Sequence, residues 1–81
     1  MFHPEFRQDL RFWIRTDRKV ANRILKVVES AVREPTKGIG KPEPLRFHLE
    51  GCWSRRISQE HRLVYLVRKG RIDFLQCRYH Y

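Results

Sequence analysis

The sequence lacks long apolar runs, and it has few acidic residues. No apolar stretch approaches the roughly 20 residues that a membrane-spanning helix needs, and residues 1–12 contain none of signal-peptide length. We therefore expect a cytosolic location and no membrane partner. Only 9 Asp and Glu stand against 18 Lys and Arg, which gives a formal net charge of +9. Because 13 of these cations are arginines, whose planar fork of donors suits phosphate oxygens, we expect a polyanionic partner.

The sequence also lacks the motifs of disulfide-bonded, metal-binding and nucleotide-binding proteins. The two cysteines, Cys52 and Cys77, are expected to be reduced because the chain shows no secretion signal. The His and Cys residues have no CxxC or HxxxH spacing, so we expect no metal site and no cofactor. The segment Gly38-Ile39-Gly40 lacks the third glycine of a dinucleotide-binding loop and the Gly-Lys-Ser/Thr of a P-loop. That segment therefore predicts a turn.

The length of 81 residues is that of one small domain and excludes a multidomain enzyme. With 41% hydrophobic residues and ten aromatics, the chain has enough apolar side chains to bury a core. A domain of this size buries only about 60% of its unfolded surface, so a deep enclosed pocket is not expected. We predict a single domain over residues 1–81.

The first part of the chain has the apolar spacing of two helices. Pro4 suits the first helical turn, and the apolar positions that follow predict a helix over residues 4–15. Thr16 or Asp17 can cap a second helix, which should end before Pro35 because the residue before a proline is displaced from helical geometry. The two helices should form an antiparallel hairpin.

The second part predicts a small sheet. Residues 35–51 hold three of the four prolines and three of the four glycines, which is typical of an irregular connection. Alternation and turn signals then predict three antiparallel strands, over residues 52–57, 62–67 and 72–79. The fold class is therefore α+β, with two N-terminal helices packed on one face of a small antiparallel sheet. The other face should stay partly open to solvent or a ligand.

One carboxylate stands in a restrained position. Glu43 lies between Pro42 and Pro44, with Lys41 and Arg46 on either side. The two prolines fix the backbone around Glu43 at low entropic cost, which suits a catalytic group. An exposed loop glutamate in a surface ion pair would show the same pattern.

Arginines lie on two of the predicted strands. Alternation places Arg55 and Arg56 on opposite faces, so at most one of them shares a surface with Arg62. Two guanidinium groups on the uncovered face would form a phosphate clamp. The alternative is a solvated face with cross-strand pairs to Glu60 or Asp73.

The chain closes with an acid–base candidate. His80 has an ordinary pKa near neutrality, and the aromatics beside it can stack on unpaired bases. A frayed terminal histidine is the alternative. A carboxylate, a histidine and arginines suffice, without a metal, for attack of an RNA 2′-hydroxyl on its own phosphate. Such a nuclease leaves a 2′,3′-cyclic phosphate and a 5′-hydroxyl.

These segments resemble the YoeB/Txe branch of the RelE superfamily, and the resemblance runs from about Trp13 to Tyr81. It rests on four segments in order, which are GIGKPEPL at 38–45, GCWSRRI at 51–57, EHRLVY at 60–65 and CRYHY at 77–81. Members of that family are toxins of bacterial toxin–antitoxin pairs that enter the ribosomal A site and cut the mRNA there. The resemblance implies a RelE-like microbial RNase fold and a ribosome-dependent mRNA interferase.

The resemblance also implies roles for individual residues. Glu43 matches the family's general base, Arg62 its phosphate-stabilising arginine, His80 its general acid, and Tyr81 the terminal tyrosine that organises the site. Arg46 stands where the family commonly carries a lysine. The expected RNA-binding residues are Lys41, Arg46, Arg55 and Arg56.

The same resemblance implies partners for the chain, and the sequence differs from the family pattern at two positions. A cognate YefM-like antitoxin, acidic and initially disordered, should fold over the basic surface, and homodimers are expected. Operator DNA would be contacted only through the antitoxin. Only Met1, Phe2 and His3 precede Pro4, so the family's first strand should be shortened, and Cys52 stands where an aromatic residue is commoner.

Two other functions fit the same composition. A module that binds RNA or the ribosome and blocks translation without cutting would need the arginines but not Glu43. A transcriptional co-repressor acting with the antitoxin is the second alternative. Nothing in the sequence resembles a helix-turn-helix, so DNA reading would come from the partner.

Overall fold

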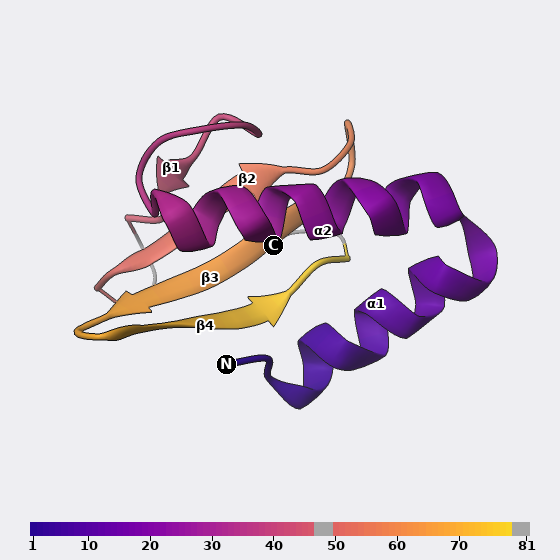
Figure 1. Cartoon of the computed structure of the whole chain (residues 1–81), viewed down its shortest axis with the longest axis horizontal. Coiled ribbons are helices and arrows are strands. Elements are labelled where there is room, and N and C mark those ends of the chain that lie inside the picture. Colours follow the sequence, from indigo (N-terminus) through magenta and orange to yellow (C-terminus); the bar gives the residue numbers. More distant parts are fainter. Residues whose placement is uncertain (47–49, 79–81) are drawn as a thin grey trace.

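The chain folds into a layer of two helices and a layer formed by one sheet (Figure 1). A computed structural model describes residues 1–46 and 50–78. The strands of the sheet are antiparallel and follow one another in chain order. The elements are α1 (Pro4–Thr16), α2 (Arg18–Arg33), β1 (Glu43–Pro44), β2 (Cys52–Arg56), β3 (Arg62–Arg68) and β4 (Arg71–Gln76). The predicted α+β class, both helices and the three longer strands are confirmed.

The differences from the predicted elements are small and have local causes. The sequence predicted the third strand to residue 79, whereas β4 ends at Gln76, and residue 79 lies outside the described residues. The short strand β1 was not predicted, because two residues show no alternation. Pro44 has no N–H to donate, and it is tolerated because β1 is an edge strand of the sheet.

One residue joins the two helices. The backbone N–H of Asp17 donates to the Trp13 carbonyl at 2.8 Å, which closes the last turn of α1. The Asp17 carboxylate then accepts hydrogen bonds from the N–H groups of Lys19, at 3.1 Å, and Val20, at 3.3 Å. These bonds satisfy two of the free N–H groups at the start of α2. The predicted antiparallel hairpin follows from this tight turn.

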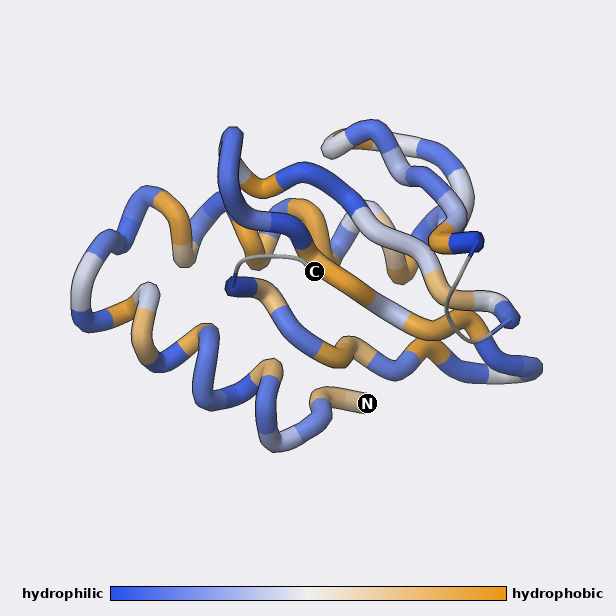
Figure 2. The backbone as a smooth tube through the Cα atoms, turned by 180° about the vertical axis from the view of Figure 1, so that it is seen from behind, coloured by the Kyte–Doolittle hydropathy of each residue, from blue (hydrophilic) through white to orange (hydrophobic). Residues whose placement is uncertain are grey.

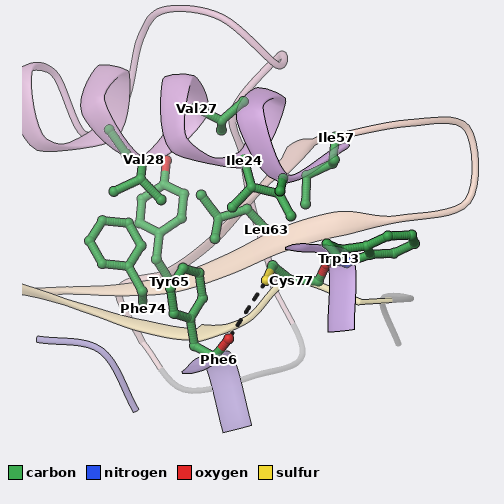
Figure 3. Close-up of a cluster of buried hydrophobic side chains, with 12 residues drawn as sticks. Phe6, Trp13, Ile24, Val27, Val28, Ile57, Leu63, Tyr65, Phe74 and Cys77 are labelled. Carbon is green, nitrogen blue, oxygen red and sulfur yellow. Dashed lines mark hydrogen bonds between the residues drawn. The ribbon is translucent and has the colours of Figure 1, made fainter. Parts of the chain in front are cut away.

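The main core lies between α2, α1 and one face of the sheet (Figure 3). Burial of each large apolar side chain contributes about 1.5–3 kcal/mol. The indole N–H of Trp13 donates to the Cys77 carbonyl at 3.0 Å and so ties α1 to the chain beyond β4. The largest members of this core are Phe6, Trp13, Ile24, Val27, Val28, Ile57, Leu63, Tyr65 and Phe74.

A second, smaller cluster lies apart from the main core. It contains the buried residues Cys52, Val64 and Leu66, with Leu45 and Leu75 packed against them. The central strand β3 is therefore hydrophobic along most of its length, as Figure 2 shows from the side opposite α2. Both cysteines are buried and free. They belong to different clusters, so they do not pair with each other in this fold.

The expected first strand is reduced to a single bridge beside β4. Phe2 pairs with Phe74 in the parallel sense. The N–H of His3 donates to the Phe74 carbonyl at 3.0 Å, and the N–H of Phe74 donates to the Met1 carbonyl at 2.7 Å. Stacking of Phe2 on Phe6, with ring centroids 4.9 Å apart, adds an apolar contact. The shortened segment therefore still covers part of the β4 edge.

A buried carboxylate links the β3–β4 hairpin to the N-terminal segment. The side chain of Asp73 is 1% exposed, and its Oδ2 accepts a hydrogen bond from Arg68 Nε at 2.7 Å. Arg71 Nε lies 3.2 Å from Oδ1, and His3 Nε2 lies 3.9 Å from Oδ2. Burial acts to raise the pKa of Asp73, but the Arg68 hydrogen bond and the charges of Arg71, Arg68 and His3 outweigh it and lower the pKa.

Replacing Asp73 by asparagine is expected to lower the urea midpoint at pH 7, because the variant keeps the shape but loses the charge that the arginines face. A lowered folded-state pKa stabilises the protein above the unfolded value of about 3.9 and loses this effect as the pH falls through the folded value. The difference between wild type and Asp73→Asn should therefore shrink in urea titrations below pH 4. Asp17→Asn is the control, since asparagine caps helices as well as aspartate does. Equal midpoints for wild type and Asp73→Asn at pH 7 would contradict this expectation.

Candidate active site

The fold brings Glu43 and Arg62 together on the sheet face that does not carry the helices. Glu43 lies opposite Ser54 in the β1–β2 register, and Arg62 lies opposite Arg56 in the β2–β3 register. Arg62 Nη2 donates to Glu43 Oε1 at 2.7 Å. The Glu43 side chain is 64% exposed, whereas that of Arg62 is only 16% exposed. An accessible carboxylate is thus paired with a guanidinium that the protein holds in place.

Ser54 holds the guanidinium of Arg62. The Ser54 side chain is fully buried, and its Oγ accepts a hydrogen bond from Arg62 Nε at 3.0 Å. Ser54 is not among the site residues that the sequence predicts. A signal was present, because Ser54 and Arg56 are two residues apart on β2 and therefore share one face.

The backbone before Glu43 has an uncommon geometry. Gly40 and Lys41 both have positive φ, 84° and 49°, which is rare for a residue with a side chain such as lysine. The chain then enters Pro42 and the short strand β1. This turn, together with the prolines, leads into β1, whose pairing with β2 places Glu43 opposite Ser54.

Other cations border the pair. Arg56 is exposed and lies directly across from Arg62, so the two side chains share a face. Lys41 and Arg46 are exposed on either side of β1. Within residues 1–46 and 50–78, none of these three cations forms an ion pair. Their charges are therefore available to a polyanion.

The prediction that Arg55 binds RNA is wrong. Arg55 has no exposed surface, and its guanidinium donates hydrogen bonds to groups of the protein itself. Alternation correctly placed Arg55 and Arg56 on opposite faces, and the face of Arg55 is the one that the helices cover. A phosphate cannot reach it there.

His80 and Tyr81 lie outside the described residues, so the structure places neither of them. The chain before them is anchored as far as Arg78. The N–H of Cys77 donates to Asp9 Oδ2 at 3.0 Å, and the Arg78 guanidinium carbon lies 3.6 Å from the centroid of the Phe12 ring.

The described parts of the chain offer acid–base and phosphate-binding groups. Glu43 can accept a proton, and Arg62 can neutralise an oxyanion. Among the described residues, no three His, Cys, Asp or Glu side chains are grouped to hold a metal ion. No helix in the same residues is both long and apolar enough to cross a membrane.

Comparisons with known proteins cover the whole fold. A family model for the YoeB-like toxin of bacterial type II toxin–antitoxin systems matches residues 2–81. Toxin YoeB of Mycobacterium bovis is 49% identical over 80 residues, which are 99% of this chain and 94% of that protein.

Solved structures agree with the sequence matches. A YoeB/ParE toxin from Agrobacterium tumefaciens has a TM-score of 0.94 at 42% identity, over 100% of this chain and 96% of that one. YoeB from Staphylococcus aureus was solved as a dimer, with a TM-score of 0.90 at 40% identity, and in a YoeB–YefM complex, with 0.88 at 39%. Each match covers 100% of this chain and 94% of the other.

Proposed function

The chain belongs to the YoeB family of toxins of bacterial type II toxin–antitoxin systems, and we propose that it is an endoribonuclease that cuts mRNA in the ribosomal A site. Cleavage there would stop translation. The observation that carries this proposal is the pair of Glu43 and Arg62, joined at 2.7 Å on an exposed, basic face. A base next to a phosphate-binding cation is what a metal-independent ribonuclease requires.

The reaction begins at the 2′-hydroxyl of the nucleotide that is cut. Glu43 takes the proton of this hydroxyl, and the oxygen attacks the adjacent phosphorus. Arg62 stabilises the negative charge of the phosphorane. The bond from phosphorus to the 5′-oxygen breaks, and His80 gives its proton to that oxygen, while Tyr81 helps to organise the site. The products are a 2′,3′-cyclic phosphate and a 5′-hydroxyl.

When RNA binds, Arg62 would exchange its contact with Glu43 for a contact with a phosphate of the substrate. In the free protein Arg62 faces Glu43, so an entering phosphate competes with the carboxylate for the guanidinium. The bond to Ser54 keeps Arg62 near its place while its Nη2 turns to the phosphate. Glu43 is then released beside the 2′-hydroxyl, and its high exposure leaves room for the ribose.

The remaining exposed cations bind the RNA backbone in this proposal. Lys41, Arg46 and Arg56 border the pair and have no ion-pair partner in the described parts of the chain. Their contacts are to phosphate and carry no sequence information.

We also propose that a YefM-like antitoxin neutralises this chain and that the chain forms homodimers. The support is the Staphylococcus aureus relative, which was solved both with YefM and as a dimer. An acidic antitoxin segment complements the net charge of +9. Operator DNA would be reached only through the antitoxin, and the toxin would act in the cytoplasm, where the ribosomes are.

Cleavage of one end-labelled mRNA, free and then bound to 70S ribosomes, tests the proposed activity. We expect a cut only on ribosomes, with 5′-hydroxyl and cyclic-phosphate ends, and we expect it to disappear in His80→Ala. Binding of that variant to ribosomes should be unchanged. A wild-type protein that stalls translation but leaves the message intact would instead be a non-cleaving inhibitor.

A further inference from the structure

The guanidinium of Arg55 uses all of its donors inside the protein. A guanidinium has five N–H groups, and five acceptors surround this one. Nε donates to the Tyr65 hydroxyl at 2.9 Å. Nη1 donates to Ser30 Oγ at 2.8 Å and the Ile39 carbonyl at 3.1 Å, and Nη2 donates to the carbonyls of Glu34 at 2.6 Å and Lys37 at 2.8 Å.

Most of these acceptors belong to one segment. Three are carbonyls of residues 34–40, which connect the end of α2 to the turn before β1. Ser30, from the last turns of α2, also accepts the N–H of Ile39 at 3.3 Å. The Tyr65 hydroxyl donates to the Pro35 carbonyl at 2.6 Å. The whole connection is thereby tied to one buried side chain on β2.

The segment also packs against α2 and β2 without room for side chains at its two glycines. A Cβ on Gly38 would lie 2.3 Å from Ser30 Oγ, and a Cβ on Gly40 would lie 3.0 Å from both Arg55 Cβ and the Arg56 carbonyl oxygen. The N–H of Arg56 donates to the Gly40 carbonyl at 2.6 Å. Gly40 is only three residues before Glu43, so the position of this segment sets where the carboxylate enters the site.

The buried charge makes this arrangement hard to distort. Within residues 1–46 and 50–78 no carboxylate pairs with Arg55, so its charge is compensated by the hydroxyl and carbonyl dipoles and by the Tyr65 ring, whose centroid lies 5.6 Å from the guanidinium carbon. Burying a charge without such partners is costly. Any displacement of residues 34–40 that removes acceptors therefore raises the free energy of the folded state, and one loop conformation is favoured over the others.

We propose that Arg55 is a positioning residue of the nuclease, which fixes residues 34–40 against β2 and thereby holds Glu43 beside Arg62. This role rests on the proposed function, because it concerns the base of that reaction. Arg55 touches neither the RNA nor the reacting atoms, and it acts through Glu43.

Substitution by lysine tests this role. Arg55→Lys keeps the charge but offers three donors in place of five and no planar fork. We expect single-turnover cleavage on ribosomes, at saturating toxin, to fall about 10²-fold, as a displacement of about 1 Å does. The affinity for ribosomes should change less than about twofold, since the exposed cations remain. Ile24→Val, in the core away from residues 34–40, is the control for lost stability and should cleave at the wild-type rate.

A double-mutant cycle separates positioning from general damage to the fold. In the Glu43→Gln background, Arg55→Lys should cost nothing further, because the group that it positions is already inactive. If the two losses multiply, or if Arg55→Lys alone cleaves at the wild-type rate, the positioning role is wrong.

Amide hydrogen exchange provides a readout that does not depend on cleavage. The backbone N–H groups of Ile39 and Arg56 should exchange faster in Arg55→Lys than in the wild type. In Ile24→Val their exchange should change only as much as the lower global stability of that variant requires. Should Arg55→Lys not fold, Ser30→Ala removes one acceptor of Arg55 near the end of α2 and should show faster exchange at Arg56 with a smaller loss of rate. Wild-type protein that cleaves nothing would refute the proposed function, while unchanged exchange in the variants would refute the anchoring by Arg55.

Discussion

Replacing Glu43 by glutamine is expected to lower the rate of mRNA cleavage on ribosomes by about 10²–10⁴-fold, the usual contribution of a general base. Glutamine has the same shape, and its side-chain oxygen can still accept the hydrogen bond that Arg62 donates at 2.7 Å. It cannot take a proton from the 2′-hydroxyl. The geometry of the pair should therefore persist while the chemical step fails.

Single-turnover kinetics at saturating toxin measure this loss directly. Glu29→Gln provides a matched control, because Glu29 is an exposed residue of α2, on the other side of the sheet from the site, and its loss changes the net charge equally. We expect Glu29→Gln to cleave at the wild-type rate and Glu43→Gln to bind ribosomes normally. Full activity in Glu43→Gln would mean that another group is the base.

How much the sequence predicts depends on the kind of pattern that each residue belongs to. The helices followed from apolar spacing, and their ends followed from Pro4, Asp17 and Pro35. The three longer strands followed from alternation. The strand β1 has two residues and a proline, so no period exists from which to infer it. Its partner strand, which lies eight or more residues further along the chain, determines that it is a strand at all.

The error at Arg55 is more instructive, because the local signal was present. Trp53, Arg55 and Ile57 alternate on one face, and Arg55 lies opposite the buried residue Leu63. The apolar neighbours therefore indicated a covered position. The net charge of +9 favoured RNA binding at this position, whereas the acceptors that make burial of a guanidinium tolerable come from residues distant in the sequence. Those acceptors, at residues 30–39 and at Tyr65, cannot be inferred before the fold is known.

Glu43 and Arg62 were selected separately, and their contact results from sheet topology. Nineteen residues separate them in sequence. They meet because β1 and β3 both pair with β2, so that Glu43 and Arg62 lie near its end on the same face. Residue type and spacing identified the chemistry, whereas the antiparallel register supplied the distance.

Replacing Arg62 by methionine is expected to lower the cleavage rate at saturating toxin by about 10²–10³-fold, as loss of one group that stabilises a transition-state anion does. Methionine keeps an unbranched apolar chain in place of the arginine stem, but it has no charge to stabilise the phosphorane. Arg62→Lys should recover only part of the rate, because an ammonium cannot bind Ser54 Oγ and a phosphate in the geometry of a fork.

Arg56→Met provides the comparison that separates a loss of cleavage rate from a loss of RNA binding. Arg56 lies directly across from Arg62 but has no ion-pair partner in the described residues, so it should contribute to binding alone. Its replacement should weaken ribosome affinity and reduce the salt dependence of binding by about one ion, with the saturated rate unchanged. The opposite result, in which Arg62→Met changes only affinity, would make both arginines backbone contacts. If Arg62→Met instead lowers the saturated rate and Arg56→Met does not, the two arginines on this face differ in role, because Ser54 and Glu43 hold Arg62 in place and leave Arg56 free.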